Sequence, residues 1–177
     1  MPLQRAALGM VHGRFQPFHR GHLEYLLAAS ERCRELLVGI TNPEPGPVPG
    51  EPASPHRHLA EANPYTFAER SAMIRAALID TGFDTRRVEV VPFPIHDSSQ
   101  WHRYVPAGTT HFLRVFSEWE AAKADRLRTA GFAVVELPAP ALKEVSGTEV
   151  RRRMAAGEDW RELVPPAVAR LIGGEKR

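Results

Sequence analysis

Residues 6–22 read AALGMVHGRFQPFHRGH, an apolar run followed at once by a segment that begins with glycine and holds two arginines and two histidines. The apolar run is typical of a buried strand. Residues 22–34 have the apolar spacing of an amphipathic helix, and residues 35–41 (ELLVGIT) form a second apolar run. Strand, helix and strand in succession make a βαβ unit, which requires a parallel sheet.

Beyond this unit the pattern continues to alternate between strands and helices. We expect strands at residues 88–92, 111–116 and 132–137, helices at 66–78, 98–104, 119–129 and 146–154, and one or two short helices over 160–172. Two helices open with a capping-box pattern, Thr66 with Glu69 and Ser146 with Glu149. The sequence therefore predicts a doubly wound (Rossmann-like) α/β fold with a parallel five-stranded sheet and short C-terminal helices. In such folds ligands bind beyond the carboxyl ends of the strands.

The length of the chain predicts one domain over residues 1–177, with a sizeable core. The irregular part is residues 43–64, where prolines and glycines exclude a helix or a central strand. A loop of this length is usually functional or disordered. Two interpretations stay open, a mobile flap that ends against the site and a disordered insertion.

Composition is that of an ordinary globular protein, with 43% hydrophobic and 25% charged residues. A formal net charge of +2 does not indicate a nucleic-acid partner. No apolar run approaches the ~20 residues of a membrane span, and no signal peptide precedes the first strand, so we expect no membrane contact and a cytoplasmic location. Cys33, alone on the predicted helix, is expected to be buried. A homo-oligomer is left open.

The segment that follows the first strand has the position of a phosphate site, because the first amides and the dipole of a helix attract anions. His19 and His22, three residues apart, face the same way. Both can donate hydrogen bonds to phosphate oxygens and to the charge that builds up as a phosphoanhydride breaks. Gly13 permits a tight turn, Gly21 lets a nucleotide approach the backbone, and Arg14 adds a fork for phosphate.

Other interpretations of this segment are weaker. It is not a P-loop, because no Gly-Lys-Ser/Thr follows and no lysine occurs before Lys123. Two histidines three apart can bind zinc, but no cysteine, aspartate or glutamate accompanies them closely. A structural histidine pair is the remaining alternative. We therefore expect a phosphate site and no metal held by the protein's own side chains.

Residues 146–153 (SGTEVRRR) open a late helix that has a similar character. The hydroxyl groups of Ser146 and Thr148, the first amides and Arg151 would form another anion-binding helix start. Capped helices followed by arginines are common, so this pattern alone indicates little. The pattern becomes informative because it occurs together with the earlier histidine segment.

These two segments, in this order, resemble the HxGH-type nucleotidylyltransferase superfamily, and most of all the archaeal-type nicotinamide mononucleotide adenylyltransferases. The resemblance extends to residues 63–70 (NPYTFAER), Trp101 and residues 160–165 (WRELVP). It implies an enzyme that cuts a nucleoside triphosphate between its α- and β-phosphates. The nucleotide would pass to a small phosphate-bearing or phosphonate acceptor, with Mg²⁺ carried by the triphosphate.

The resemblance also implies roles by position. Its catalytic residues would be His19, His22, Arg14 and Arg151. Its nucleotide-binding residues would be Gly13, Phe15, Gly21, Ser117, Glu118, Ser146 and Thr148. Its acceptor-binding residues would be Asn42, Arg70 and Trp101, although a tryptophan in the core is the alternative for Trp101.

Two turns depart from the family pattern. Ser117-Glu-Trp-Glu120 replaces the usual Ser-Gly/Asn-Asn-Pro after the fourth strand, and Thr41-Asn42-Pro43 replaces Gly-Ser after the second. The first interpretation is ATP plus nicotinamide or nicotinate mononucleotide, giving NAD⁺ or its deamido form. The alternative is a cytidylyltransferase that joins CTP to a small phosphonate or phosphate. A nucleotide-binding regulator without activity is the third.

Overall fold

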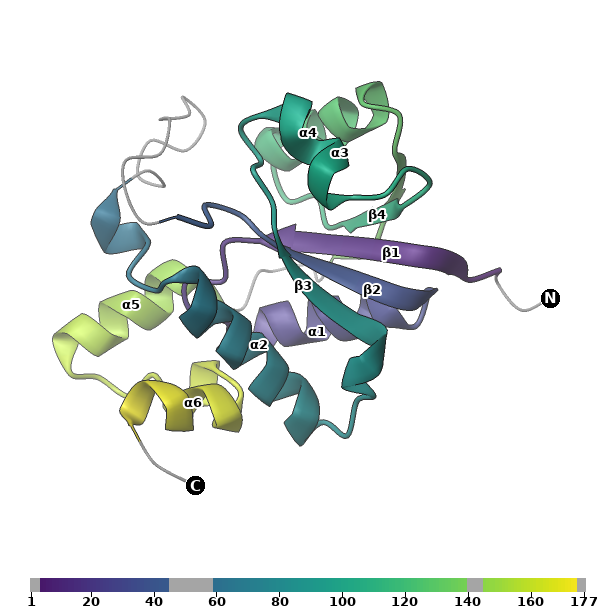
Figure 1. Ribbon diagram of the computed structural model, residues 1–177. Helices are drawn as coiled ribbons and strands as arrows, with labels where there is room; N and C mark the ends of the chain where they lie inside the picture. The colour runs from purple at the N-terminus through teal and green to yellow at the C-terminus, as the bar shows by residue number, and fades with distance from the viewer. Residues whose placement is uncertain (1–3, 45–58, 140–144, 175–177) are drawn as a thin grey trace. The chain divides into compact units, whose positions relative to one another are not determined.

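The computed structural model describes residues 4–44, 59–139 and 145–174. Strand β1 (Ala6–Gly13) is followed by helix α1 (Arg20–Ser30) and pairs in parallel with β2 (Cys33–Ile40). The apolar run of β1 is buried from Gly9 to His12, as expected of a central strand. The predicted βαβ unit is confirmed (Figure 1).

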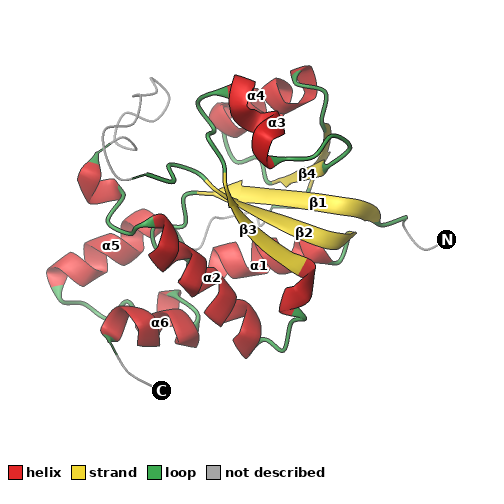
Figure 2. Ribbon diagram, viewed as in Figure 1, coloured by secondary structure: helices red, strands yellow, loops and turns green. Residues whose placement is uncertain are grey.

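A five-stranded sheet forms around this unit in the order β3-β2-β1-β4-β5, and every neighbouring pair is parallel. Its other strands are β3 (Val88–Pro92), β4 (Thr110–Leu113) and β5 (Ala133–Glu136). The strand order runs outward from β1 in both directions and reverses between β1 and β4. Figure 2 shows β1 with β2 on one side and β4 on the other. This is the doubly wound, Rossmann-like sheet that the sequence predicts, with its topological switch point between those two strands.

The remaining helices are α2 (Phe67–Asp80), α3 (Trp101–Tyr104), α4 (Glu118–Thr129), α5 (Gly147–Ala156) and α6 (Pro166–Gly173). Short 3₁₀ turns lie at Ala60–Ala62, Thr85–Arg87, Ser98–Gln100 and Arg161–Leu163. Within the described ranges, no helix combines the length and the apolar character that crossing a membrane requires.

The chain divides into two units. One consists of Met1–Gly13, Tyr25–Pro43 and Arg87–Ala141. The other consists of Arg14–Glu24, Glu44–Arg86 and Leu142–Arg177. We call the first the sheet unit, because it holds all five strands, and the second the helical unit. One domain over residues 1–177 stays a prediction.

The core of the sheet unit is an apolar cluster between the sheet, α3 and α4. Its buried members are Met10, Leu37, Phe93, Ile95, Trp101, Val105, Leu113, Ala124, Leu127 and Phe132. Residues 25–30 of α1 lie on the opposite face of the sheet from α4 (Figure 1). There the hydroxyl group of Tyr25 donates a hydrogen bond to the carbonyl oxygen of Phe112.

In the helical unit, α2 packs against α6. An ion pair between Arg170 and Asp80, at 2.7 Å, joins the two helices. The capping box predicted for α2 is confirmed: the Thr66 hydroxyl accepts from the backbone N–H of Glu69, and the Glu69 carboxylate accepts from the backbone N–H of Thr66.

Some predicted boundaries were wrong. Helix α1 ends at Ser30 rather than residue 34, because Cys33 pairs with Ala6 and starts β2. Cys33 is buried as expected, but on a strand. Strand β4 ends at Leu113 rather than residue 116. Most of the proline-rich stretch, residues 45–58, lies outside the described residues.

Candidate active site

The helical unit brings the two motif histidines into direct contact. The rings of His19 and His22 stack with centroids 3.5 Å apart. The backbone N–H of His19 donates to Nδ1 of His22 at 3.2 Å, and the backbone N–H of His22 donates to Nδ1 of His19 at 3.3 Å. A ring nitrogen that accepts carries no proton, so each neutral imidazole has its proton on Nε2. Both rings can therefore donate through Nε2.

The surroundings of the pair differ from an open helix start. His19 is only 3% exposed, while His22 is half-buried. The buried Phe15 and Phe18 lie against His22, with centroids 4.9 and 5.6 Å away. Phe15, rather than Gly13, adopts the left-handed backbone conformation, with φ 54°. The expected glycine turn is thus made one residue after Arg14, by a phenylalanine that packs on His22.

Arg151 joins the second motif to the first within this unit. Its Nη1 donates to the carbonyl oxygen of Gln16 at 2.6 Å, and its Nη2 donates to the Thr148 hydroxyl at 3.3 Å. Burial lowers the pKa of Arg151 from its ordinary value. The guanidinium is therefore held at the start of α5, beside the loop that carries the histidines.

Two glycines permit close packing around these residues. A Cβ atom on Gly147 would lie 3.0 Å from the carbonyl oxygen of Gln16, and one on Gly21 would lie 3.0 Å from the His19 ring. A side chain at Gly147 would crowd the contact between the two motifs, and one at Gly21 would crowd the ring of His19. Gly21 thus makes room for a histidine of its own motif.

Helix α5 begins with half of the predicted capping box. The Ser146 hydroxyl accepts from the backbone N–H of Glu149 at 3.1 Å. The Glu149 carboxylate instead accepts from Arg152 and Arg153, which lowers its pKa to about 2. Stronger charged partners have displaced the reciprocal bond, so the full capping box was a wrong prediction. Arg151 is the arginine of this run that reaches the first motif.

Arg70, predicted to bind the acceptor, is 1% exposed. Its Nη1 donates to the carbonyl oxygen of Arg14 at 2.9 Å, and its Nε donates to the carbonyl oxygen of Thr66. Burial lowers its pKa to about 10, which leaves it charged near neutral pH. The Arg14 side chain reaches the carbonyl oxygen of Ala62 at 3.4 Å. Arg70 therefore fixes the backbone of a predicted catalytic residue.

Gln16 was not singled out from the sequence. It is 3% exposed, and its side chain makes a two-point contact with the backbone of Tyr65. Nε2 donates to the Tyr65 carbonyl oxygen at 3.0 Å, and Oε1 accepts from the Tyr65 N–H at 2.9 Å. Its own carbonyl oxygen receives Arg151. The only sequence signal was its place inside the motif.

Five other predicted residues belong to the sheet unit. Gly13 ends β1, where its carbonyl oxygen accepts from the backbone N–H of Thr41 at 2.9 Å. Asn42, half-buried beyond β2, has a left-handed backbone with φ 49°. Gly13 ends one central strand and Asn42 follows another, and ligands of doubly wound folds bind at such carboxyl ends.

Trp101 is fully buried in the core of the sheet unit. Its ring packs near Phe93, with centroids 5.5 Å apart, and its Nε1 donates to the carbonyl oxygen of Pro94 at 2.9 Å. The guanidinium of Arg126 lies 5.4 Å from the ring centroid. These contacts are those of a core tryptophan, and contact with an acceptor stays a prediction.

Ser117 and Glu118 lie exposed at the start of α4. The Ser117 hydroxyl donates to the carboxylate of Glu120, which ties that carboxylate to the turn. Glu118 lies in the first helical turn, where a negative charge is favourable. Nucleotide binding by this turn stays a prediction.

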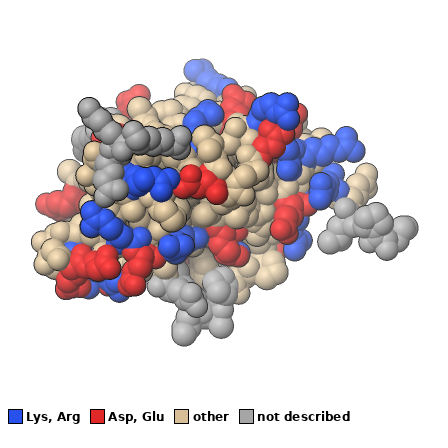
Figure 3. Space-filling view, turned by 90° about the horizontal axis from the view of Figure 1, so that it is seen from below, with Lys and Arg blue, Asp and Glu red and all other residues tan. Residues whose placement is uncertain are grey.

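No group of three or more potential metal ligands, among His, Cys, Asp and Glu, occurs in the described parts of the chain. The predicted catalytic residues of the helical unit offer imidazole N–H and guanidinium donors, which suit anions. On the face drawn in Figure 3, basic and acidic side chains are interspersed.

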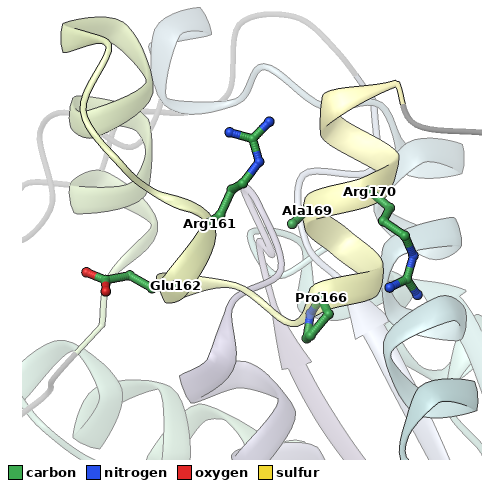
Figure 4. Close-up of a pocket in the computed structure, with 5 residues that line it drawn as sticks. All are labelled: Arg161, Glu162, Pro166, Ala169 and Arg170. Carbon is green, nitrogen blue, oxygen red and sulfur yellow. The ribbon is translucent and has the colours of Figure 1, made fainter.

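A hollow of about 460 Å³ lies elsewhere in the helical unit (Figure 4). Its lining residues are Arg161, Glu162, Pro166, Ala169 and Arg170. In Figure 4 the side chains of Arg161 and Arg170 point away from each other, and Arg170 is paired with Asp80. No predicted site residue lines this hollow.

Comparison with known proteins identifies the family of this chain. The Cytidylyltransferase-like family model matches residues 10–153, a range that contains both motifs. The chain is 47% identical over 169 residues to "Phosphonoformate cytidylyltransferase" of Streptomyces viridochromogenes, covering 96% of this chain and 92% of that one. It is 34% identical over 165 residues to "Nicotinamide-nucleotide adenylyltransferase" of Pyrococcus horikoshii, covering 93% and 81%.

Among solved structures, the chain resembles a bifunctional NMN adenylyltransferase/ADP ribose pyrophosphatase from Francisella tularensis, with a TM-score of 0.72. That likeness covers 95% of this chain and 49% of the other, so this chain spans about half of that protein's length. The identity is 17%, and the likeness therefore bears on the fold alone.

Proposed function

This chain belongs to the cytidylyltransferase-like family and is a nucleotidyltransferase, and we propose that it transfers the cytidylyl group of CTP to a small phosphonate or phosphate acceptor. One observation carries this choice of substrates. Identity is 47% to the relative named phosphonoformate cytidylyltransferase, against 34% to the nicotinamide-nucleotide adenylyltransferase. Of the two substrate pairs that the sequence left open, this favours the second.

In the proposed reaction, an oxygen atom of the acceptor attacks the α-phosphorus of CTP. A bond forms between them as the bond from the α-phosphorus to the oxygen that bridges to the β-phosphorus breaks. Pyrophosphate leaves with the electron pair of that bond. The acceptor brings its own nucleophile, so the protein contributes positioning and charge stabilisation.

The stacked histidines are suited to the charge that grows on the leaving pyrophosphate. Both hold their protons on Nε2, because both Nδ1 atoms accept from backbone N–H groups. Fixed donors stabilise developing charge better than donors that must reorganise during the reaction. We propose that His19 and His22 donate to the β-phosphate and to the bridging oxygen.

Arg151 is suited to the β- and γ-phosphates. A guanidinium presents several N–H groups in one plane, so hydrogen bonds to Gln16 and Thr148 leave further N–H groups for a phosphate. Ser146, Thr148 and the first amides of α5 add neutral donors beside it. We propose that this helix start holds the triphosphate tail.

The arginines near the first motif divide between holding the backbone and contacting a substrate. Arg70 is charged but buried, so we give it the task of fixing the Arg14 backbone, and the half-buried Arg14 side chain that of contacting a substrate phosphate. Asn42 and Trp101 are kept as acceptor-binding proposals from the family resemblance. Phe15, Gly13, Ser117 and Glu118 are kept in the same way for the nucleotide.

A divalent cation, Mg²⁺ in our proposal, would arrive with the triphosphate and neutralise part of its charge. The described side chains do not fit a metal cage, because they form no cluster of three or more suitable ligands. Phosphate oxygens and water would therefore supply its ligands.

ATP with nicotinamide or nicotinate mononucleotide is the second candidate pair, which would place the enzyme in NAD⁺ formation. Several relatives named nicotinamide-nucleotide adenylyltransferase, at 33–36% identity over 90% or more of this chain, support it. Both candidates imply small-molecule partners. A cytoplasmic location and the lack of a nucleic-acid partner belong to the same proposal.

The test is pyrophosphate release from each of the four triphosphates, with phosphonoformate and with the two pyridine mononucleotides as acceptors. We expect CTP with phosphonoformate to give the highest kcat/KM, and reactions without an acceptor to stay at background. A higher kcat/KM for ATP with a mononucleotide would replace the first candidate by the second.

A further inference from the structure

Two histidines outside the motif lie in the core of the sheet unit. His12 is 5% exposed and His111 is fully buried. Neither ring nitrogen of either residue has a hydrogen-bond partner among the described residues. Buried polar atoms without partners destabilise a fold and are uncommon in native proteins. Four such nitrogen atoms in one place therefore call for a functional reason.

The pair lies beside the topological switch point. His12 is the residue before the last in β1, and His111 is in β4. Met10 pairs with His111 across the two strands, and Met10 and His12 are two residues apart, so all three side chains share one face. The imidazole centroids are 6.3 Å apart. Ligands of doubly wound folds bind beyond the strand ends at this point.

The surroundings of the pair are aromatic. Phe93 lies 5.2 Å from His12 and 6.1 Å from His111, between ring centroids, and Phe132 lies 4.7 Å from His111. Burial lowers the pKa of His111 to about 4 and that of His12 well below its ordinary value, with smaller contributions from Lys123 and from His111. Near neutral pH each ring is uncharged and offers one donor and one acceptor.

We propose that His12 and His111 form a binding element for the uncharged nucleoside part of the substrate, beside the topological switch point between β1 and β4. His12, one residue before the end of its strand, makes the contact with the nucleoside, and because both of its ring nitrogens are buried the ring must shift to reach the ligand. His111 acts as a positioning residue behind it, through a water molecule or through a small shift of the ring.

The chemistry of the pair selects the nucleoside over the other parts of the substrates. A triphosphate, a phosphonate or a phosphate is charged, and an aromatic environment with uncharged histidines disfavours a buried anion. Ribose hydroxyls and base ring atoms are uncharged, and they provide both donors and acceptors. A neutral imidazole can change its tautomer to suit either, so the pair should bind all nucleosides without choosing between bases.

This inference rests on the proposed function only in taking a nucleoside triphosphate as the ligand. Its test measures binding without an acceptor, by titrating CTP, ATP and inorganic triphosphate into the protein. For His12→Leu we expect the Kd of CTP and of ATP to rise by about tenfold, the size of one lost buried hydrogen bond. The Kd of inorganic triphosphate should not change. Failure of turnover with every acceptor would leave this binding result intact.

Thr109→Val is the matched control, because Thr109 is also buried and its hydroxyl donates to the carbonyl oxygen of Pro106. It should lower the Tm and leave all three Kd values unchanged. Leu at position 12 should instead keep or raise the Tm of the ligand-free protein, since it replaces unpaired polar atoms. If His12→Leu does not fold, His111→Phe takes its place in the titration, with the same expected pattern.

Rescue separates binding from packing. His12→Asn or His12→Gln keeps a donor and an acceptor, and at least one of them should restore nucleotide affinity relative to His12→Leu. The proposal is overturned if nucleotide Kd values are unchanged in His12→Leu, or if inorganic triphosphate loses affinity equally. A lowered Tm with unchanged affinity would identify the pair as a structural unit around an internal water molecule.

Discussion

Arg151 donates a hydrogen bond to the carbonyl oxygen of Gln16 at 2.6 Å, across 135 residues of sequence. Gln16 lies three residues before His19, in the same loop. The late helix and the histidine motif are thus joined by one guanidinium, which then has further N–H groups to offer to phosphate. This contact unites the two sequence motifs within the helical unit.

Arg151→Lys should lower kcat/KM by about tenfold or more, because an ammonium group cannot reproduce a planar fork. Arg153→Lys is the matched control. Its guanidinium pairs with the carboxylates of Glu149 and Glu162 on the surface of the helical unit. The measurement is kcat/KM of both variants by steady-state kinetics. Equal losses of kcat/KM would indicate a general effect of basic charge.

Gln16→Leu should lower kcat, because it removes both side-chain hydrogen bonds to Tyr65 and loosens the loop that receives Arg151. The fold should change little. We expect a loss of about tenfold. Thr81→Ala, which loses a single hydroxyl-to-carbonyl bond in the same unit, serves as the control. A kcat that falls only in proportion to the folded fraction would contradict a positioning role.

His19→Ala and His22→Ala should each lower turnover by ~10²-fold, the usual cost of a lost donor to developing charge. His22→Ala should be the milder change for stability, since His22 is half-buried whereas His19 is 3% exposed. Kinetics on protein shown to be folded by circular dichroism provide the measurement. Near-normal turnover in either variant would remove that residue from the mechanism.

Base preference is expected to favour ATP or CTP over GTP and UTP. A glutamate after the fourth strand can accept from the exocyclic amino group that adenine and cytosine share. Glu118 is exposed, whereas the Glu120 carboxylate is tied to Ser117. We therefore expect Glu118→Ala to weaken the preference more than Glu120→Ala, as measured by kcat/KM for the four triphosphates. An unchanged preference in both would leave the turn as ordinary helix capping.

The stability of the protein should fall as pH drops from about 6.5 to about 4. In this range the unfolded chain protonates its histidines, while burial keeps the pKa of His111 at about 4 in the folded state. The unfolded state then binds more protons, so acid favours it, by up to about 1.4 kcal/mol per pH unit for one histidine. His111→Phe should reduce this slope, as followed by urea unfolding at several pH values. An unchanged slope would mean that His111 titrates normally.

The order of elements and the motifs were predictable from the sequence. Apolar runs typical of strands, such as residues 6–12, alternate along the chain with segments that have the apolar spacing of a helix. This alternation of strands and helices predicts a parallel sheet. The pairing of the HxGH segment with Arg151 followed from the resemblance. The end of α1 could not be predicted from the sequence, because Cys33 is apolar enough for either a helix or a strand. Its pairing with Ala6 places it in β2.

The details of the site depended on contacts between distant residues. Nothing local indicates that Gln16 clamps Tyr65, that Arg70 is buried under the Arg14 backbone, or that His12 and His111 share one face. Likewise, the pattern Ser146 to Glu149 suggests a full capping box, yet Arg152 and Arg153 compete for the carboxylate. The spacing of apolar residues indicates which side of a helix or strand is buried. It does not indicate which distant residues form hydrogen bonds with each other.

In the proposed reaction the cytidylyl group moves to the acceptor. The most direct measurement follows ³²P from CTP labelled at the α-phosphate, in the presence of phosphonoformate. We expect the label to appear in a cytidylyl–phosphonoformate conjugate while unlabelled pyrophosphate is released in equal amount. Label recovered as free CMP or in pyrophosphate, or a conjugate formed only from ATP and nicotinamide mononucleotide, would contradict it.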